Sequence, residues 1–248
     1  MHGNVVYNKI QENVPLLRTN ESIKSKSNLN EEGKCKFGTR EYWDAMYTGK
    51  GDRPASSYSW YCQWPELEPF FKELVPDKSA RILVPGIGND PTPVEMYDAG
   101  YNDMIAFDYV EAAVDRAKIQ FGPDRKNVRI MVADATSLPL PNGSVDATLD
   151  KGTLDAIRIA DRYLYDKSVQ ELSRVTAEGG VVVCVSRVIE AEEWLEAFSP
   201  PTWETIHNGE LAFTENGEAT IDLGADLYSF RRTGTQHHGE KLSLPTEE

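Results

Sequence analysis

The chain has 248 residues, 40% hydrophobic and 10% aromatic, and its 40 acidic against 26 basic residues give a formal net charge of −14. This length and apolar content suffice for one domain with a sizeable core, and the negative charge argues against a general nucleic-acid binder. Three widely spaced cysteines predict neither a disulfide framework nor a zinc site. No apolar run is long enough to span a bilayer, and the N-terminus lacks the apolar core of a signal peptide. We therefore expect a soluble, cytoplasmic protein without a membrane partner.

Polar stretches are expected to flank the folded part. Residues 1–36 carry mixed charge and only a short VPLL cluster, which predicts a mobile tail. A basic transit peptide is the competing interpretation, and four acidic residues argue against it: Glu12, Glu21, Glu31 and Glu32. Residues 237–248 form a second polar tail, in which the pair His237 and His238 has no third ligand nearby to make a metal site. The domain is therefore expected over residues 37–236.

An aromatic-rich segment opens this domain. Residues 37–75 are expected to form a cover with helices near 39–47 and 65–74. Its clustered aromatic residues are Tyr42, Trp43, Tyr47, Tyr58, Trp60, Tyr61 and Trp64.

Strand and helix patterns alternate after the cover. Apolar, β-branched runs bounded by turn residues occur at 81–85, 103–108, 127–134, 144–150 and 179–186. Helical spacing lies between most of them, so the fold class is α/β, with a mostly parallel seven-stranded sheet and helices on both faces. We place the last two strands near 202–207 and 225–232, with "HNGELAFTENGEAT" between them as a loop or short hairpin. The 191–198 stretch predicts a core helix, and Cys62 and Cys184 are expected to be buried as small hydrophobes.

A glycine turn follows the first of these strands. Gly86 and Gly88 allow a ligand close to the backbone. A dinucleotide fingerprint would have its third glycine where Pro91 stands, and proline removes an amide that a pyrophosphate would use. S-adenosylmethionine has no phosphate and needs backbone contacts and carboxylates, so it fits this turn better than NAD.

Three later strands end in aspartate. Asp108 lies 20 residues after Gly88, where a carboxylate can accept both ribose hydroxyls of an adenosine. Asp134 is expected beside the adenine edge, and Asp150 near the methionine part and the reacting sulfur. Each alone is better explained by a loop or helix cap, but all three in register with the glycine turn favour a cofactor site.

These motifs resemble those of the class I S-adenosylmethionine-dependent methyltransferases, within them the methyltransferase-like group that includes lysine methyltransferases acting on elongation factor 1-alpha. The resemblance covers about residues 39–187 and rests on "EYWDAMY", "YSWY", "ILVPGIGN", "FDYV", "VADAT" and "DKGTLDAI". It implies a Rossmann-like fold and cofactor contacts from Trp43, Tyr47, Trp60, Gly86, Asp108, Tyr109, Asp134, Ala135 and Lys151. From about residue 188 onward no motif matches, and "LVPGIGND" also resembles halide and thiol methyltransferases.

Methyl transfer from a sulfonium is an in-line displacement that needs no metal and yields S-adenosylhomocysteine. Aromatic faces suit the cationic sulfur. An acceptor that arrives protonated needs a general base, for which Asp150 and Asp155 are candidates. Asp155 is explained equally by charge complementarity at a helix start, and Lys151 by pairing with a neighbouring acid.

The sequence leaves the acceptor open. A small molecule is favoured narrowly, because the aromatic cover could close over a compact ligand, and a lysine in a basic protein segment is the alternative. A non-catalytic cofactor-binding module would bind without turnover. A nicotinamide-dependent reductase would need a catalytic Tyr and Lys pair, of which Tyr163 and Lys167 offer only a faint version.

Overall fold

The computed structural model describes residues 35–215 and 218–234. The predicted tails, except for Cys35 and Lys36, and the His237–His238 pair lie outside the described residues, so the domain boundaries stay predictions. Within these ranges, no helix combines the length and apolar character needed to cross a membrane.

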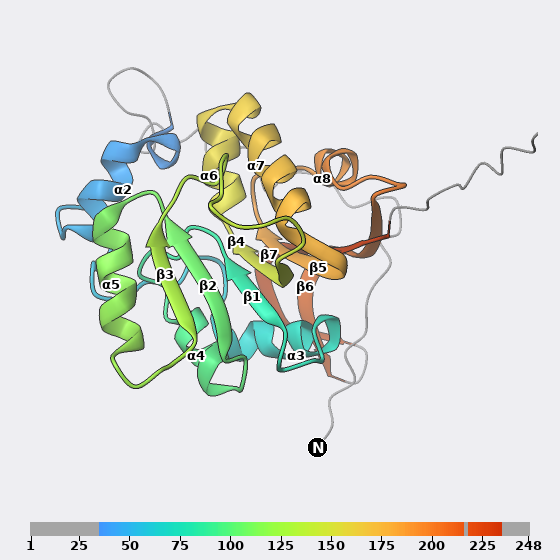
Figure 1. Ribbon diagram of the computed structural model, residues 1–248, viewed down its shortest axis with the longest axis horizontal. Helices are drawn as coiled ribbons and strands as arrows, with labels where there is room; N and C mark the ends of the chain where they lie inside the picture. The colour runs from blue at the N-terminus through green and yellow to red at the C-terminus, as the bar shows by residue number, and fades with distance from the viewer. Residues whose placement is uncertain (1–34, 216–217, 235–248) are drawn as a thin grey trace, which may run out of the picture.

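A seven-stranded sheet forms the centre of the molecule, in the order β3-β2-β1-β4-β5-β7-β6 (Figure 1). Its strands are β1 Arg81–Val84, β2 Asp103–Asp108, β3 Val128–Val132, β4 Val145–Lys151, β5 Thr176–Ser186, β6 Trp203–Glu215 and β7 Glu218–Arg232. Strands β1 to β5 pair in parallel, whereas β7 is antiparallel to both β5 and β6. The order reverses beside β1, and ligands of such sheets bind at the carboxyl ends of the strands near this point. The predicted fold class is confirmed.

Helices cover both faces of the sheet. One face packs against α3 Trp64–Leu74, α4 Thr92–Asp98 and α5 Glu111–Phe121, and the other against α6 Thr153–Ala160, α7 Arg162–Val175 and α8 Ala191–Ala197. The period of two in a strand explains the division: Ile82 and Val84 point to the first face, and Leu83 between them points to the second. Trp194 of α8 is fully buried, which confirms the predicted core helix.

The cover begins with a short helix η2, Lys36–Gly38, followed by α2, Arg40–Tyr47. Thr39 caps α2 by accepting a hydrogen bond from the Tyr42 amide. A β-carbon on Gly38 would lie 2.8 Å from the Ala160 Cα, so the backbone of η2 packs directly on α6. Helix α2 lies beside α5, where Met46 and Tyr47 pack on Val110 and Ala113. The two predicted helices of the cover are therefore present, as α2 and α3.

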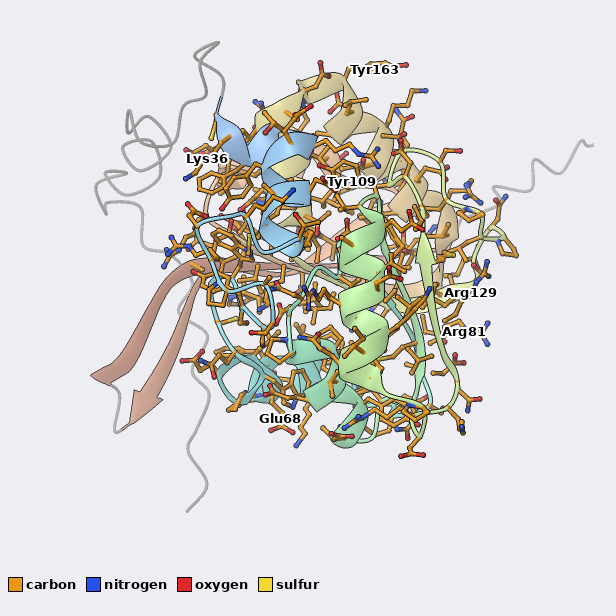
Figure 2. The ribbon with its side chains drawn as sticks, turned by 90° about the vertical axis from the view of Figure 1, so that its left-hand side faces the viewer. Lys36, Glu68, Arg81, Tyr109, Arg129 and Tyr163 are labelled. Atoms are coloured by element: carbon orange, nitrogen blue, oxygen red, sulfur yellow. The ribbon has the colours of Figure 1, made fainter. Side chains whose placement is uncertain are left out.

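The prediction for the last two strands is wrong in its extent. Strands β6 and β7 pair continuously from Trp203 opposite Arg232 to Glu215 opposite Glu218, so the segment taken for a loop or short hairpin is mostly strand. Asn208 and Gly209 suggested a turn, yet they lie within β6, beside register shifts that absorb such residues as bulges. Figure 2 shows this long hairpin extending beyond the body of the molecule.

Candidate active site

A cavity of about 760 Å³ lies where the carboxyl ends of β1 to β5 meet the cover. It is lined by most of the residues predicted for the site: Trp43, Tyr47, Trp60, Gly86, Asp108, Tyr109, Asp134, Ala135, Lys151 and Asp155. Gly88 and Asp150 do not reach its wall. The cavity thus brings together predicted site residues up to 112 positions apart in the sequence, since Trp43 on α2 and Asp155 on α6 both line it.

Asp108 ends β2 and is 3% exposed. One carboxylate oxygen accepts a hydrogen bond from the Gly88 amide at 3.1 Å and the other from the Val110 amide at 2.9 Å. Burial raises the pKa of this carboxyl to about 6, while the backbone amides act in the opposite direction. The two backbone hydrogen bonds hold the carboxylate in one orientation. Each oxygen keeps a lone pair, so the carboxylate can still accept a hydrogen bond from a ligand.

The two glycines of the turn have different roles in the structure. Gly86 has a φ of +51°, and a β-carbon there would lie 2.3 Å from the Thr153 Oγ1. Gly88 has a φ of +54°, and its β-carbon would lie 2.7 Å from the Tyr47 Oη. Both positions therefore demand glycine. Gly86 borders the cavity, whereas Gly88 shapes it from behind by fixing Asp108.

Aromatic rings from α2 and the loop after it form the roof. The Trp43 and Tyr47 rings stack with their centroids 6.1 Å apart, and Trp60 meets Trp43 edge-on at 5.9 Å. Tyr58 packs on Trp60 at 4.9 Å and also lines the cavity, although the sequence had assigned it no site role. Its spacing of two residues from Trp60 in the same aromatic cluster is the signal that could have found it.

Asp134 and Tyr109 form the part of the wall at β2 and β3. Asp134 follows β3 and accepts hydrogen bonds from the Thr136 amide and hydroxyl, each at 2.8 Å, so it caps a turn at the cavity edge. The Arg40 guanidinium lies 5.3 Å from the centre of the Tyr109 ring and donates to the Tyr109 carbonyl. Figure 2 shows Tyr109 at the junction of α2 and α5. Tyr109 is 38% exposed, so this end of the cavity is aromatic and partly open to solvent.

Both candidate bases, Asp150 and Asp155, are buried, and each already accepts hydrogen bonds from the protein. Asp150 is 1% exposed and accepts from the Leu154 amide at 3.2 Å; burial and the charge of Asp155 raise its pKa to about 8. Asp155 accepts from the Tyr61 hydroxyl at 2.6 Å and the Ser186 hydroxyl at 2.6 Å. Asp150 thus lies behind the cavity wall, and Asp155 touches the cavity with its oxygens already engaged.

Lys151 pairs with a neighbouring acid, as one of its two interpretations predicted. Its ammonium lies 2.6 Å from the Asp90 carboxylate.

Other predicted features lie away from the cavity. Tyr163 is 65% exposed, and the Lys167 ammonium lies 5.6 Å from its ring centre (Figure 2). Neither residue lines the cavity, so the reductase pair is not brought to the site. Cys62 and Cys184 are buried, as predicted. In the described ranges, no group of three or more His, Cys, Asp or Glu side chains could hold a metal ion.

Comparison with known proteins agrees with the geometry of the site, because the similar proteins are methyltransferases. Residues 83–184 match a family model described as a methyltransferase domain. The Mus musculus eEF1A lysine and N-terminal methyltransferase is 29% identical over 163 residues, 64% of this chain and 23% of that protein. The Bos taurus EEF1A lysine methyltransferase 4 is 32% identical over 165 residues, 60% of this chain and 61% of that protein. The chain thus spans about a quarter of the length of the first of these relatives.

A solved structure shares the fold. The Burkholderia thailandensis 1,6-didemethyltoxoflavin-N1-methyltransferase, crystallised with 1,6-didemethyltoxoflavin and S-adenosylhomocysteine, is similar with a TM-score of 0.55 and 14% identity, covering 78% of this chain and 86% of that one. The sheet order, the cavity at its carboxyl edge and the matched domain agree with one another. Residues 83–184 therefore match a methyltransferase domain, and the chain has the Rossmann-like fold of the class I S-adenosylmethionine-dependent methyltransferases.

Proposed function

We propose that the chain binds S-adenosylmethionine in the cavity and transfers its methyl group to a nucleophile of a small molecule. The observation that carries the proposal is the Asp108 carboxylate, fixed by the Gly88 and Val110 amides at the end of β2 and facing the cavity. In this position it accepts hydrogen bonds from the ribose hydroxyls. The residues present fit the cofactor, because the cavity pairs a held carboxylate with aromatic faces.

The remaining contacts follow from the order of the strands. Asp134 and Ala135 at the end of β3 bind the adenine end, and Gly86 leaves room for the backbone of the turn to approach the ligand. Trp43, Tyr47 and Trp60 present ring faces, which attract a sulfonium by about 0.5–2 kcal/mol. When bound, the cofactor supplies an electrophilic methyl group, and the protein aligns the acceptor and excludes water.

The acceptor then enters on the side of β4 and β5. Three arginines line the cavity: Arg40 beside the Tyr109 ring, Arg53 at 5.3 Å from the Tyr58 ring centre and Arg187 at 5.6 Å from the Tyr61 ring centre. Beside Arg187, the Asp155 carboxylate already accepts from the Tyr61 and Ser186 hydroxyls and from the Arg187 amide. Guanidinium groups beside a carboxylate that already accepts three hydrogen bonds disfavour a protonated lysine at this side of the cavity and favour a neutral or anionic small acceptor.

A protein lysine is the second candidate, and the printed names of the curated relatives favour it. The net charge of −14 would also attract a basic protein segment. The two candidates separate in one assay, in which the purified chain is given methyl-labelled S-adenosylmethionine with either a panel of small thiols and amines or elongation factor 1-alpha.

Label on a small molecule, lost in the Asp108→Ala variant, would support the proposal, and label on protein alone would replace it by the second candidate. Binding of the cofactor in calorimetry with no turnover on either class would favour a non-catalytic binding module. A preference for NADH over S-adenosylmethionine would overturn the assignment of the cofactor.

The proposed role of Asp108 predicts a pH dependence of cofactor binding. Its pKa is raised to about 6, and only the ionised carboxylate accepts two hydrogen bonds from the ribose. Affinity should therefore be constant near pH 7 and fall by up to about tenfold per pH unit below pH 6, because protonation removes the acceptor. Calorimetric titrations with S-adenosylmethionine between pH 5 and 7 measure this. The Asp108→Asn variant is the control, and the same pH profile in that variant would contradict the role.

A further inference from the structure

The loop between the roof and α3 holds a strained turn. The Cys62 amide donates to the Trp60 carbonyl at 2.8 Å, which makes a three-residue turn of the γ type centred on Tyr61, and Tyr61 has a φ of +67°. A bulky residue rarely adopts a positive φ, and such strain persists only where the surroundings hold it. Both Trp60 and Tyr61 line the cavity, so the turn decides where their rings lie.

The Lys151 ammonium lies at the centre of this turn. Its Nζ is 3.0 Å from the Trp60 carbonyl oxygen, 2.7 Å from the Cys62 carbonyl oxygen and 2.6 Å from the Ser59 Oγ. The Ser59 hydroxyl in turn donates to the Cys62 carbonyl at 2.8 Å. Lys151 belongs to β4 and is 6% exposed, so a buried cation from the sheet binds both carbonyls of the strained turn.

The same ammonium reaches the glycine turn. Asp90, two residues after Gly88, lies 2.6 Å from the Lys151 Nζ, and its side chain is 16% exposed. An ammonium has three N–H donors, and four acceptors already lie within 3.0 Å of it. No donor remains for a ligand, which distinguishes Lys151 from the cofactor-contacting role that the family resemblance implied.

Tyr61 is fixed at its other end as well. Its hydroxyl donates to Asp155 on α6 at 2.6 Å, and its ring packs so closely on Gly152 that a β-carbon there would lie 2.9 Å away. The ring therefore has one position between α6 and the end of β4, provided that the backbone of the turn is held.

We propose that Lys151 is a positioning residue: it binds no ligand, but ties the Trp60–Cys62 turn to Asp90 and so holds Trp60 and Tyr61 at the cavity. The inference rests on the proposed function, because the rings matter only if the cavity binds the cofactor and its acceptor. It connects the glycine turn, the end of β4 and the roof through one side chain.

Two variants separate positioning from general stability. Lys151→Met removes the donors but leaves the largely buried Asp90 charged without its cation, with the Thr92 amide as a remaining donor, which lowers stability by itself. Lys151→Met combined with Asp90→Asn removes that charge, so its thermal midpoint should recover toward wild type. We expect this double variant to bind S-adenosylmethionine at least tenfold more weakly in calorimetry, despite the recovered fold.

The thiol of Cys62 reports the turn directly. It is 4% exposed, and we expect it to react with a thiol reagent at least tenfold faster in the double variant, mapped by mass spectrometry against the buried Cys184. Lys78→Met is the matched control, since the Lys78 Nζ donates to the Ala99 carbonyl at 3.0 Å away from the cavity. It should change neither cofactor binding nor the reactivity of Cys62.

The outcomes are distinguishable. Cofactor binding within twofold of wild type in the double variant would overturn the positioning role, and continued protection of Cys62 would overturn the anchoring of the turn. A wild-type chain that does not bind S-adenosylmethionine would overturn the proposed function instead, and the thiol measurement would still decide whether Lys151 anchors the turn.

Discussion

Replacement of Asp108 by alanine is expected to weaken S-adenosylmethionine binding at least about 100-fold. A hydrogen bond to a charged group contributes about 1.5–3 kcal/mol, and each 1.4 kcal/mol is tenfold in affinity, so two ribose bonds account for this loss. The variant also leaves the Gly88 and Val110 amides without their acceptor, which loosens the glycine turn. Calorimetric titration at pH 7 measures the effect.

Two controls accompany this variant. Asp108→Asn keeps the shape and one acceptor oxygen, so it should lose less affinity than Asp108→Ala. Asp115→Ala removes an exposed carboxylate on the nearby helix α5 and should leave binding unchanged. A dissociation constant for Asp108→Ala within threefold of wild type would mean that the carboxylate does not contact the ligand.

Replacement of Gly86 by alanine should lower the free energy of unfolding by about 2–5 kcal/mol and abolish cofactor binding. The left-handed backbone costs an L-residue about 1–2 kcal/mol, and overpacking adds about 1–3 kcal/mol, because the new methyl would lie 2.3 Å from the Thr153 Oγ1. Urea unfolding monitored by circular dichroism, with calorimetry for binding, gives both quantities.

Gly122→Ala is the matched control for Gly86→Ala. Gly122 has a φ of +65° and a ψ of −179°, a conformation that only glycine adopts readily, but nothing lies within 4 Å of its added β-carbon, so it should show a backbone cost alone, about 1–3 kcal/mol, with normal binding. In the Gly86→Ala background, Thr153→Ala removes the two closest atoms and should restore part of the stability. If Thr153→Ala restores none of the stability, the loss comes from the backbone conformation at residue 86 and not from the contact with Thr153.

The sheet was predictable where burial is strong. Strands β1, β2 and β5 are largely buried and contain continuous apolar runs with turn residues at their ends. The β6–β7 hairpin was not predictable in the same way, because its pairing passes through register shifts that break the period of two. Local pattern thus identified the centre of the sheet and underestimated its antiparallel edge.

For the site, the sequence identified positions better than roles. The carboxyl ends of parallel strands lie at one edge of the sheet, so glycines and acids that follow these strands could be predicted to lie together there. Whether an acid faces the cavity depends on packing, and Asp150 lies behind the wall for this reason. Tyr61 belonged to the predicted aromatic cluster, but its strained turn gave no signal, because the partners of the turn, Lys151 and Asp155, lie about 90 residues later in the chain.

The roof of the cavity has a consequence for how the chain acquires its fold. Residues of the cover make their decisive contacts far ahead in the sequence: Gly38 with Ala160, and Tyr61 with Asp155 across 94 residues. Synthesis proceeds from the N-terminus, and contacts between distant residues form late because loop closure costs entropy. The cover therefore leaves the ribosome before the strands on which it packs, and it stays exposed until those strands have been made.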